Sequence, residues 1–513
     1  MRGLFEMVEG RTYWAWATRR RNEGAEMILA AVLLAAMGPT LATTHHVLRI
    51  GGADLPYTAR AGTIALKNTK NQPDISMFYT AYTKDGADSS ARPVTFFYNG
   101  GPGGSSVWQR MAAFGPVRVL VPPPGQSVSA PYRVVNNEYS LLDVTDEVYV
   151  DAPGTGFSRL LPGGKPSDAY GVDADAGAFA QFIRLYLSAY SRWNSPKYLF
   201  GESYGTVRSA ALARLLENGF GQAIDLNGVV LMSSALNVDL LWDDASVGGN
   251  DWPYVLFLPT EAATAWYYHR VPNRPNQLPA FLAAVEHFAL TDYLTALAAG
   301  DSLPAQRREA IVAQLSAYTG LSPATIRAAN LRIAPGRFRS ELLRDQGKVV
   351  GYMDSRYSGY DPVGNREEPV WDTSDLATTP QVQAIFNDYV RTQLGYRTDL
   401  EYLPLIDVLA QWSWKHQTDL GGTSALLQRP NTIVDLSEAM AQNPSMRVFA
   451  GMGYYDFSTP YFQQEYDFAH LHLPADVRRN LTIAHYEAGH MAYIDATALA
   501  KLKADLTRWY EQR

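Results

Sequence analysis

The sequence predicts an α/β fold with a mostly parallel central sheet flanked by helices and with a largely helical insertion. Three observations indicate this: short apolar runs alternate with longer helical patterns over the first half, the pattern then becomes helical, and the alternation returns near the end. Strands that alternate with helices favour a parallel sheet with crossover helices. A length of 513 residues and a hydrophobic fraction of 47% allow one large domain with an insertion.

The first part of the predicted core, residues 43–234, begins with strand patterns separated by Gly, Asn and Asp turns, which predicts an antiparallel start to the sheet. These strands are expected at 47–50, 62–66, 75–82 and 94–98. Alternating strands and helices follow, with strands at 147–150, 198–200 and 228–232 and helices at 173–193 and 204–218.

Residues 235–430 are interpreted as a helical cap inserted into the core. Helices are expected at 279–290, 305–318 and 380–394, between loops rich in Trp, Tyr and Pro. Residues 431–513 are the second part of the core, with strands at 447–449 and 481–484 and a helix at 496–510.

Residues 1–42 are typical of a signal peptide or an N-terminal anchor. Three arginines, Arg19 to Arg21, precede an apolar run from Met27 to Met37, and small residues near Ala42 would suit cleavage. The run is short for a membrane span of about 20 residues. We therefore expect a secreted or periplasmic protein, with N-terminal anchoring as the alternative and Met27 as a second candidate start.

Composition narrows the chemistry. The net charge of −7 gives no basic footprint for nucleic acid. The chain has no cysteine, so neither disulfides nor a thiolate metal site can form. No zincin motif or glycine fingerprint of a nucleotide site is found. We expect no metal and no cofactor, so that side chains carry the reaction.

The segment from Gly201 to Gly205 reads Gly-Glu-Ser-Tyr-Gly and lies between an apolar strand and a helix-compatible run. Glycines on both sides allow the tight strand-to-helix turn that lifts the serine oxygen above the sheet, which is the nucleophile elbow of α/β-hydrolases. Ser203 is the predicted nucleophile.

A serine hydroxyl needs a base and an orienting acid, which in this fold follow the serine as acid and then histidine, each after a late strand. Asp456 follows the strand near Phe449, and His490 follows the strand at 481–484. The rival histidines are His470, His472 and His485, and the rival acids are Asp467 and Asp495. We interpret His485 as a packing residue and the two rival acids as belonging to solvated helical faces.

A glycine-rich segment from Tyr98 to Ser106 follows the strand at 94–98. Its glycines would let backbone N–H groups approach a substrate and stabilise an oxyanion, and Pro102 stiffens the loop. No lysine follows, so a phosphate loop is a poorer interpretation.

Together, the segments 99–106, 151–158 and 201–205 and the two late loops resemble the serine carboxypeptidase family, as a bacterial-type member of the α/β-hydrolase superfamily. The resemblance covers roughly residues 46–513, only vaguely in the insertion. It implies the triad Ser203, Asp456 and His490. It also implies an oxyanion hole from the N–H groups of Gly101 and Tyr204, and a site for the substrate's C-terminal carboxylate made by Asn99, Gly100 and Glu202.

The sequence departs from the family pattern at three places. Gly104 replaces the family's cysteine, Met111 to Phe114 offer no second glutamate before Gly115, and tyrosines precede Asp456.

The resemblance implies a carboxypeptidase that acts on peptides with a free C-terminus through an acyl-enzyme on Ser203. The alternatives are an esterase or acyltransferase that uses the same triad, and a non-catalytic binding protein. A carboxyl group facing a carboxylate must share a proton with it, which predicts an acidic optimum.

Overall fold

The computed structural model describes residues 41–219, 222–241, 249–364, 366–420 and 423–512. The predicted signal peptide or anchor lies outside these residues except for its last two, and Ala42 begins the first strand. Within the described part of the chain, no helix is both long and apolar enough to cross a membrane.

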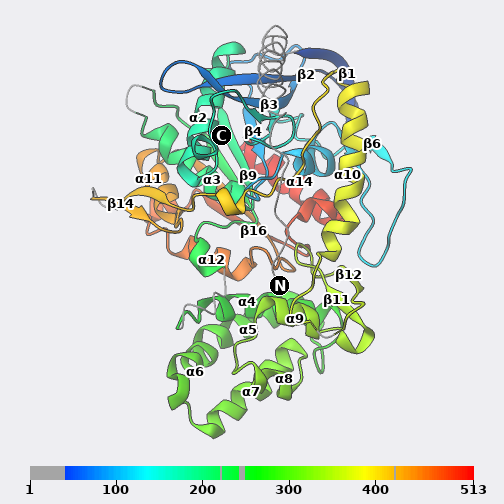
Figure 1. Ribbon diagram of the computed structural model, residues 1–513, viewed down its shortest axis with the longest axis vertical. Helices are drawn as coiled ribbons and strands as arrows, with labels where there is room; N and C mark the ends of the chain where they lie inside the picture. The colour runs from blue at the N-terminus through cyan, green and yellow to red at the C-terminus, as the bar shows by residue number, and fades with distance from the viewer. Residues whose placement is uncertain (1–40, 220–221, 242–248, 365, 421–422, 513) are drawn as a thin grey trace, which may run out of the picture. The chain divides into compact units, whose positions relative to one another are not determined.

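A ten-stranded sheet forms the centre of the fold (Figure 1). Its order is β1-β2-β3-β7-β4-β9-β10-β15-β16, and β8 pairs with β3. The strands are β1 (Ala42–Ile50), β2 (Ala53–Lys67), β3 (Pro73–Lys84), β4 (Val94–Tyr98), β7 (Asp146–Val150), β8 (Arg159–Leu160), β9 (Lys197–Glu202), β10 (Gly228–Met232), β15 (Arg447–Gly453) and β16 (Leu481–Tyr486). Strands β1 to β3 are antiparallel, and β7 is antiparallel to β3. The six strands from β7 to β16 in the sheet order, which are β7, β4, β9, β10, β15 and β16, are parallel to one another. The predicted fold class is confirmed.

Helices cover both faces of the sheet. Strands β4, β7 and β10 are buried along their whole length, as expected of strands between two helical layers. Helices α2 (Val172–Ala189) and α3 (Tyr204–Glu217) pack in the same apolar cluster as Leu231, whereas α14 (Ala496–Glu511) packs with Val230 on the opposite face. Adjacent residues of one strand thus serve opposite layers.

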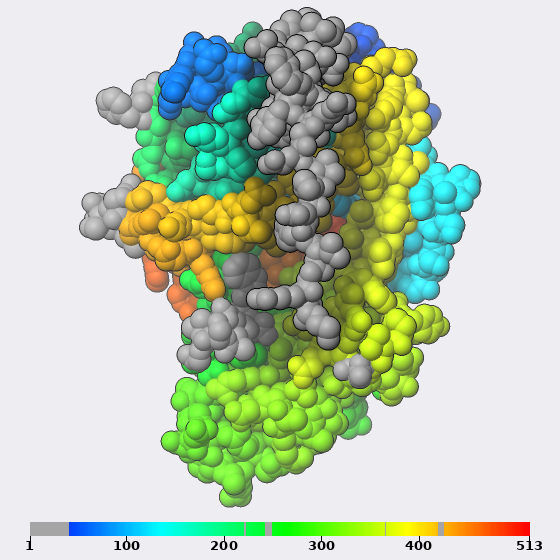
Figure 2. Space-filling model, viewed as in Figure 1, coloured from blue at the N-terminus to red at the C-terminus, as the bar shows by residue number. Residues whose placement is uncertain are grey.

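Between β10 and β15 the chain forms mostly helices, and none of the described strands there joins the large sheet. The helices are α4 (Trp252–Tyr267), α5 (Leu278–Phe288), α6 (Leu294–Ala299), α7 (Ala305–Thr319), α8 (Pro323–Ala328), α9 (Pro335–Glu341) and α10 (Thr373–Thr392). The strands are the pairs β11 (Lys348–Val350) with β12 (Ser358–Tyr360) and β13 (His416–Leu420) with β14 (Thr423–Leu427). Helices α4 to α9 lie together at the lower end of the view in Figure 1, and their residues form the green part at the lower end of Figure 2.

The remaining elements connect these parts. They are the short pair β5 (Val117–Val119) with β6 (Val134–Asn136), and the helices α11 (Ile433–Gln442), α12 (Tyr461–Ala469) and α13 (Ala475–Arg478). Short π or 3-10 turns are η1 (Gln109–Phe114), η2 (Pro166–Asp168), η3 (Val238–Leu240), η4 (Ala289–Tyr293), η5 (Gly300–Ser302), η6 (Arg344–Gln346), η7 (Leu409–Gln411) and η8 (Ala492–Ile494).

Helix α10 begins seven residues before the predicted start at residue 380. Its true N-cap is Asp372, whose side chain accepts a hydrogen bond from the N–H of Ser374. Pro380 lies inside the helix rather than at its first turn.

A segment that we call the strap, residues 401–414, crosses the glycine loop. Ser105 N–H donates to Pro404 (2.8 Å), and Ile406 N–H donates to the carbonyl of Gly103 (3.0 Å). Leu403 exchanges two backbone hydrogen bonds with Gly156, at 3.0 and 2.6 Å. The strap therefore fixes both glycine-containing segments that the sequence singled out.

Candidate active site

The three predicted triad residues follow strands at the same edge of the sheet. Ser203 follows β9, Asp456 follows β15, and His490 follows β16. Strand β10 lies between β9 and β15, and all four strands are parallel. Because the carboxyl ends of parallel strands meet at one edge, residues separated by 287 positions are brought to one place.

Ser203 occupies a strained turn between β9 and α3. Its φ of 59° and ψ of −131° lie in a region that L-residues rarely adopt. The turn needs small neighbours, because a Cβ on Gly201 would lie 2.2 Å from the carbonyl oxygen of Gly205. Its backbone N–H donates to the carbonyl of Met232 (3.0 Å), which ties the elbow to β10. This is the local structure that the Gly-Glu-Ser-Tyr-Gly segment predicted.

His490 and Asp456 form a buried hydrogen-bonded pair. His490 Nδ1 donates to Asp456 Oδ2 at 2.8 Å, and the two side chains are 3% and 0% exposed. The other carboxylate oxygen, Oδ1, accepts the backbone N–H groups of Ser458 (2.8 Å) and Thr459 (2.9 Å). An acid held in this way orients the imidazole and leaves Nε2 free for a serine proton.

Thr459 is a site residue that the sequence analysis missed. Its hydroxyl donates to Asp456 Oδ2 (2.7 Å) and lies 3.2 Å from His490 Nδ1. The signal was present, because an Asp followed two and three residues later by Ser and Thr is typical of a local turn around the carboxylate.

The charges around His490 favour its protonated form. Burial lowers the pKa of His490, but the carboxylates of Asp456 and Glu202 more than offset this, so that the pKa is raised. In the part of the chain that the structure describes, Ser203 Oγ makes no hydrogen bond to His490. Catalytic hydrogen bonds of this kind often form only in the substrate complex.

The rival residues have structural partners elsewhere. His485 Nε2 lies 2.8 Å from Glu465 Oε1, and its ring stacks on Tyr454, as packing predicts. Asp495 caps α14 through the N–H groups of Thr497 and Ala498. The interpretation of Asp467 as part of a solvated face is wrong, because this side chain is 0% exposed and accepts the N–H of Asn237 (3.3 Å).

The loop that carries His490 is supported by the insertion. His490 N–H donates to the carbonyl of Met353 (2.6 Å), and Gly489 N–H donates to Asp354 Oδ2 (3.1 Å). Arg356 pairs with Asp354 (2.6 Å) and donates to the carbonyl of Glu487 (2.6 Å). The sequence pattern gave no signal for this support, because these partners lie more than 130 positions away.

The glycine loop lies directly against the elbow. A Cβ on Gly100 would lie 2.4 Å from the backbone nitrogen of Tyr204 and 2.8 Å from Ser203 Cβ, so only glycine fits. Gly101 follows with a φ of +112°. Tyr204 is the first residue of α3, where N–H groups have no acceptor within the helix. The two predicted oxyanion donors therefore belong to adjoining segments.

Asp151, from the segment 151–158, holds the glycine loop through hydrogen bonds from Ser106. Its Oδ1 accepts the N–H and the hydroxyl of Ser106 at 2.9 and 2.6 Å. It also pairs with the buried Arg110 (3.2 Å) and accepts the hydroxyl of Tyr402 in the strap (3.3 Å). Asp151 thus holds the glycine loop in place.

Glu202, next to Ser203, has a buried carboxyl group, and only its Oε1 atom makes hydrogen bonds among the described residues. Oε1 accepts hydrogen bonds from Asn99 Nδ2 (2.7 Å) and from the hydroxyl of Tyr493 (3.0 Å). Oε2 is buried and has no hydrogen-bond partner among the described residues. Burial raises the pKa of Glu202 to about 7, although His490, Tyr493 and Asn99 act to lower it.

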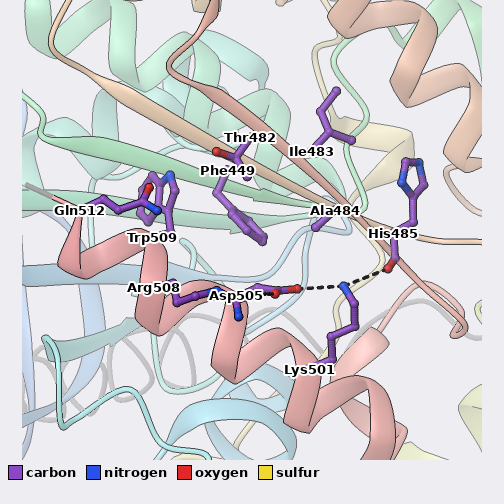
Figure 3. A pocket seen from close by; sticks show the side chains of 10 residues that line it. All are labelled: Phe449, Thr482, Ile483, Ala484, His485, Lys501, Asp505, Arg508, Trp509 and Gln512. Atoms are coloured by element: carbon purple, nitrogen blue, oxygen red, sulfur yellow. Dashed lines mark hydrogen bonds and ion pairs between the residues drawn. The ribbon is translucent and has the colours of Figure 1, made fainter.

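A pocket between β15, β16 and α14 lies apart from the triad (Figure 3). Its lining residues are Phe449, Thr482, Ile483, Ala484, His485, Lys501, Asp505, Arg508, Trp509 and Gln512. Lys501 pairs with Asp505 (2.9 Å) and also approaches the carbonyl of His485 (3.4 Å), as the dashed lines show. Arg508 pairs with the same carboxylate. We assign this pocket no role, because Lys501 and Arg508 both already pair with the Asp505 carboxylate.

The chain is similar to known proteins in sequence and in fold. Residues 55–243 match the family model described as "Serine carboxypeptidase". The chain is 28% identical over 169 residues to serine carboxypeptidase-like 7 of Arabidopsis thaliana, which is 32% of this chain and 36% of that protein. It is 30% identical over 164 residues to the pheromone-processing carboxypeptidase KEX1 of Candida dubliniensis, which is 30% of this chain and 22% of that protein. These matches span about a third or less of each relative.

A solved structure extends the likeness over most of the fold. The crystal structure of KEX1ΔP, a prohormone-processing carboxypeptidase from Saccharomyces cerevisiae, matches with a TM-score of 0.51 and 17% identity, covering 88% of this chain and 91% of that one. The α/β-hydrolase fold is therefore established. The serine carboxypeptidase family is supported by the family-model match over residues 55–243.

Proposed function

We propose that this chain, which carries the serine carboxypeptidase match, is a serine-type carboxypeptidase that releases C-terminal residues from peptides. The observation that carries the proposal is that Glu202, the residue directly before Ser203, is buried and has one carboxyl oxygen without a hydrogen-bond partner among the described residues. A carboxyl group in that position suits the terminal carboxylate of a peptide, because the two groups can share one proton.

The proposed reaction uses the triad in two steps. Ser203 Oγ attacks the carbonyl carbon of the last peptide bond while its proton passes to His490 Nε2, and the N–H groups of Gly101 and Tyr204 stabilise the oxyanion. The intermediate collapses, the C–N bond breaks, and His490 returns the proton to the departing amine. Water then attacks the acyl carbon while its proton passes to His490. The bond between the acyl carbon and Ser203 Oγ breaks, His490 returns the proton to Ser203 Oγ, and the shortened peptide leaves.

In this proposal Asn99 and the backbone at Gly100 assist Glu202 in binding the terminal carboxylate. Glu202 must be protonated, so binding weakens as the pH rises past its pKa of about 7. We propose an acidic optimum on that basis. Peptidase activity that only increased from about pH 5 to about pH 9 would count against it.

The chain is further proposed to be a bacterial-type family member that is exported through its N-terminal segment or anchored by it. The apolar run from Met27 to Met37 supports export or anchoring. The organisation into two core parts, residues 43–234 and 431–513, and a cap, residues 235–430, is proposed as well.

Substitution of Ser203 by Ala tests the assignment of the nucleophile. We expect turnover of a blocked dipeptide to fall by about 10⁵-fold or more while substrate binding is kept, because the attacking oxygen is lost. The matched control is Ser302→Ala, an exposed position in η5. Turnover that survives Ser203→Ala would contradict the triad. Equal turnover of acid and ester substrates by the unaltered chain would favour the esterase or acyltransferase.

A further inference from the structure

Tyr493 lies behind Glu202 and was not among the residues that the sequence singled out. It belongs to η8, directly after the histidine loop, and its side chain is 1% exposed. Its ring packs in the same apolar cluster as Met111 and Ala113 of η1. Its single polar atom donates to Glu202 Oε1 (3.0 Å). The hydroxyl is therefore delivered to the Glu202 carboxyl by a rigid, buried ring.

The two oxygens of Glu202 have unequal surroundings. Oε1 accepts two hydrogen bonds, from Asn99 and Tyr493, whereas the buried Oε2 has no partner among the described residues. When the carboxyl is neutral, its proton must be on one of the two oxygens. An oxygen that already faces two donors has no room for a hydrogen of its own, so the proton belongs on Oε2.

We infer that Tyr493 is a positioning residue of the carboxylate site: with Asn99 it occupies Oε1 of Glu202 and so keeps the carboxyl proton on Oε2, where a substrate carboxylate can accept it. This inference rests on the proposed function. It also accounts for the missing second glutamate before Gly115, which the resemblance leads one to expect in the carboxylate site. A phenol hydroxyl from η8 supplies the supporting hydrogen bond instead.

The phenol of Tyr493 loses its proton at a much higher pH than a second carboxyl group would. Burial and the neighbouring Glu202 raise the pKa of Tyr493, so its hydroxyl remains a donor at every pH at which the enzyme works. The other titratable groups that act on Glu202 are His490 and Asp456. Arg110, the charged residue of η1, is paired with Asp151 (3.2 Å). Substrate carboxylate binding should therefore be lost in one alkaline step, the loss of the proton that Glu202 and His490 share.

The test is Tyr493→Phe, measured with a blocked dipeptide that has a free C-terminus and with its methyl ester, between about pH 5 and pH 9. At low pH we expect KM for the acid to rise about fivefold, the usual effect of losing one hydrogen bond, with kcat changed less than about twofold. The hydrogen bond from Tyr493 lowers the pKa of Glu202, so its removal should raise that pKa and move the alkaline limb for the acid to higher pH. Kinetics with the ester should not change.

Two further variants make the result specific. Tyr510→Phe removes another buried tyrosine hydroxyl, which is bonded to Thr95 (2.9 Å), and should leave KM for the acid unchanged. Glu202→Gln places an uncharged amide in the carboxyl position. Its carbonyl can accept from Asn99 and Tyr493 while its NH₂ donates toward the substrate. In this variant, KM for the acid should not rise at alkaline pH. The double variant with Tyr493→Phe should have a higher KM for the acid, again without a rise at alkaline pH.

Equal changes in KM for acid and ester in Tyr493→Phe, or an unmoved alkaline limb, would overturn the inference. Failure of the proposed function would look different. In that case the unaltered chain would not distinguish the acid from the ester at any pH.

Discussion

At the scale of single residues, Glu202 and His490 are coupled. Each is buried, each acts on the pKa of the other, and Asp456 acts on both. In the active form proposed here, His490 is neutral and Glu202 is protonated. A protonated His490 with an ionised Glu202 would hold the same number of protons. Their titrations therefore belong to the pair rather than to either residue. Substrate carboxylate binding favours the protonated form of Glu202.

Asp456→Asn tests the orienting role of the acid. The amide can present a donor to His490 Nδ1 and so favour the wrong tautomer, which should lower kcat by about 10³- to 10⁴-fold. Asp476→Asn, at an exposed position of α13, serves as the control and should keep full activity. A kcat for Asp456→Asn within about tenfold of the unaltered chain would show that another group orients the histidine.

Residue patterns predicted the strand-to-helix turn at Ser203 well and the contacts that support it poorly. The strands β4 and β10 lie where the apolar runs predicted them, because both are buried on two faces and leave a continuous apolar signal. The contact of Tyr493 with Glu202 joins residues 291 positions apart. No local pattern encodes such a contact. Asp467 was predicted to be solvated for a related reason. The segment around Asn237, distant in sequence, covers its helix face.

At the scale of elements, the glycine loop and the elbow must fit closely together. Gly100→Ala would place a methyl group 2.4 Å from the nitrogen of Tyr204 and should displace the loop, the elbow or both. A shift of about 1 Å in such a site can lower the rate about 100-fold, and we expect at least this loss in kcat/KM.

Gly177→Ala in α2 is the matched control. A Cβ there meets nothing within 4 Å, and alanine is the better helix former. This variant should be fully active and at least as stable as the unaltered chain. Full activity of Gly100→Ala would contradict the close contact.

The β13–β14 hairpin is held to the core by His416. Its Nδ1 lies 2.6 Å from Asp173 of α2, and its Nε2 lies 2.9 Å from Asp435 of α11. Burial lowers the pKa of His416, but hydrogen bonds and charge attraction from the two carboxylates outweigh this and raise it to about 9.

A histidine whose pKa is raised on folding stabilises the fold fully below its unfolded pKa of about 6.5, and this stabilisation is lost as the pH rises through about 9. His416→Gln should therefore lower Tm most near pH 6, and the difference from the unaltered chain should shrink above pH 9. Thermal unfolding at both pH values measures this. A difference that does not depend on pH would contradict it, and His287→Gln, exposed on α5, controls for the substitution.

At the scale of the whole molecule, the catalytic edge depends on segments from the entire chain. The proposed nucleophile and the glycine loop come from the first part of the chain, the proposed base and its acid come from the last part, and the chain between β10 and β15 supplies the strap and the support by Met353 to Arg356. Sequence patterns predicted the insertion as helical. They could not predict that two of its non-helical segments hold the catalytic loops, because irregular backbone leaves no periodic signal.

The most direct test of the central claim is the mass of the products formed from one peptide offered with a free C-terminus and as its C-terminal amide. The account predicts stepwise loss of single C-terminal residues from the acid near pH 5, much slower loss from the amide, and no loss from either with Ser203→Ala. Cleavage at internal bonds, or equal loss from acid and amide, would contradict it.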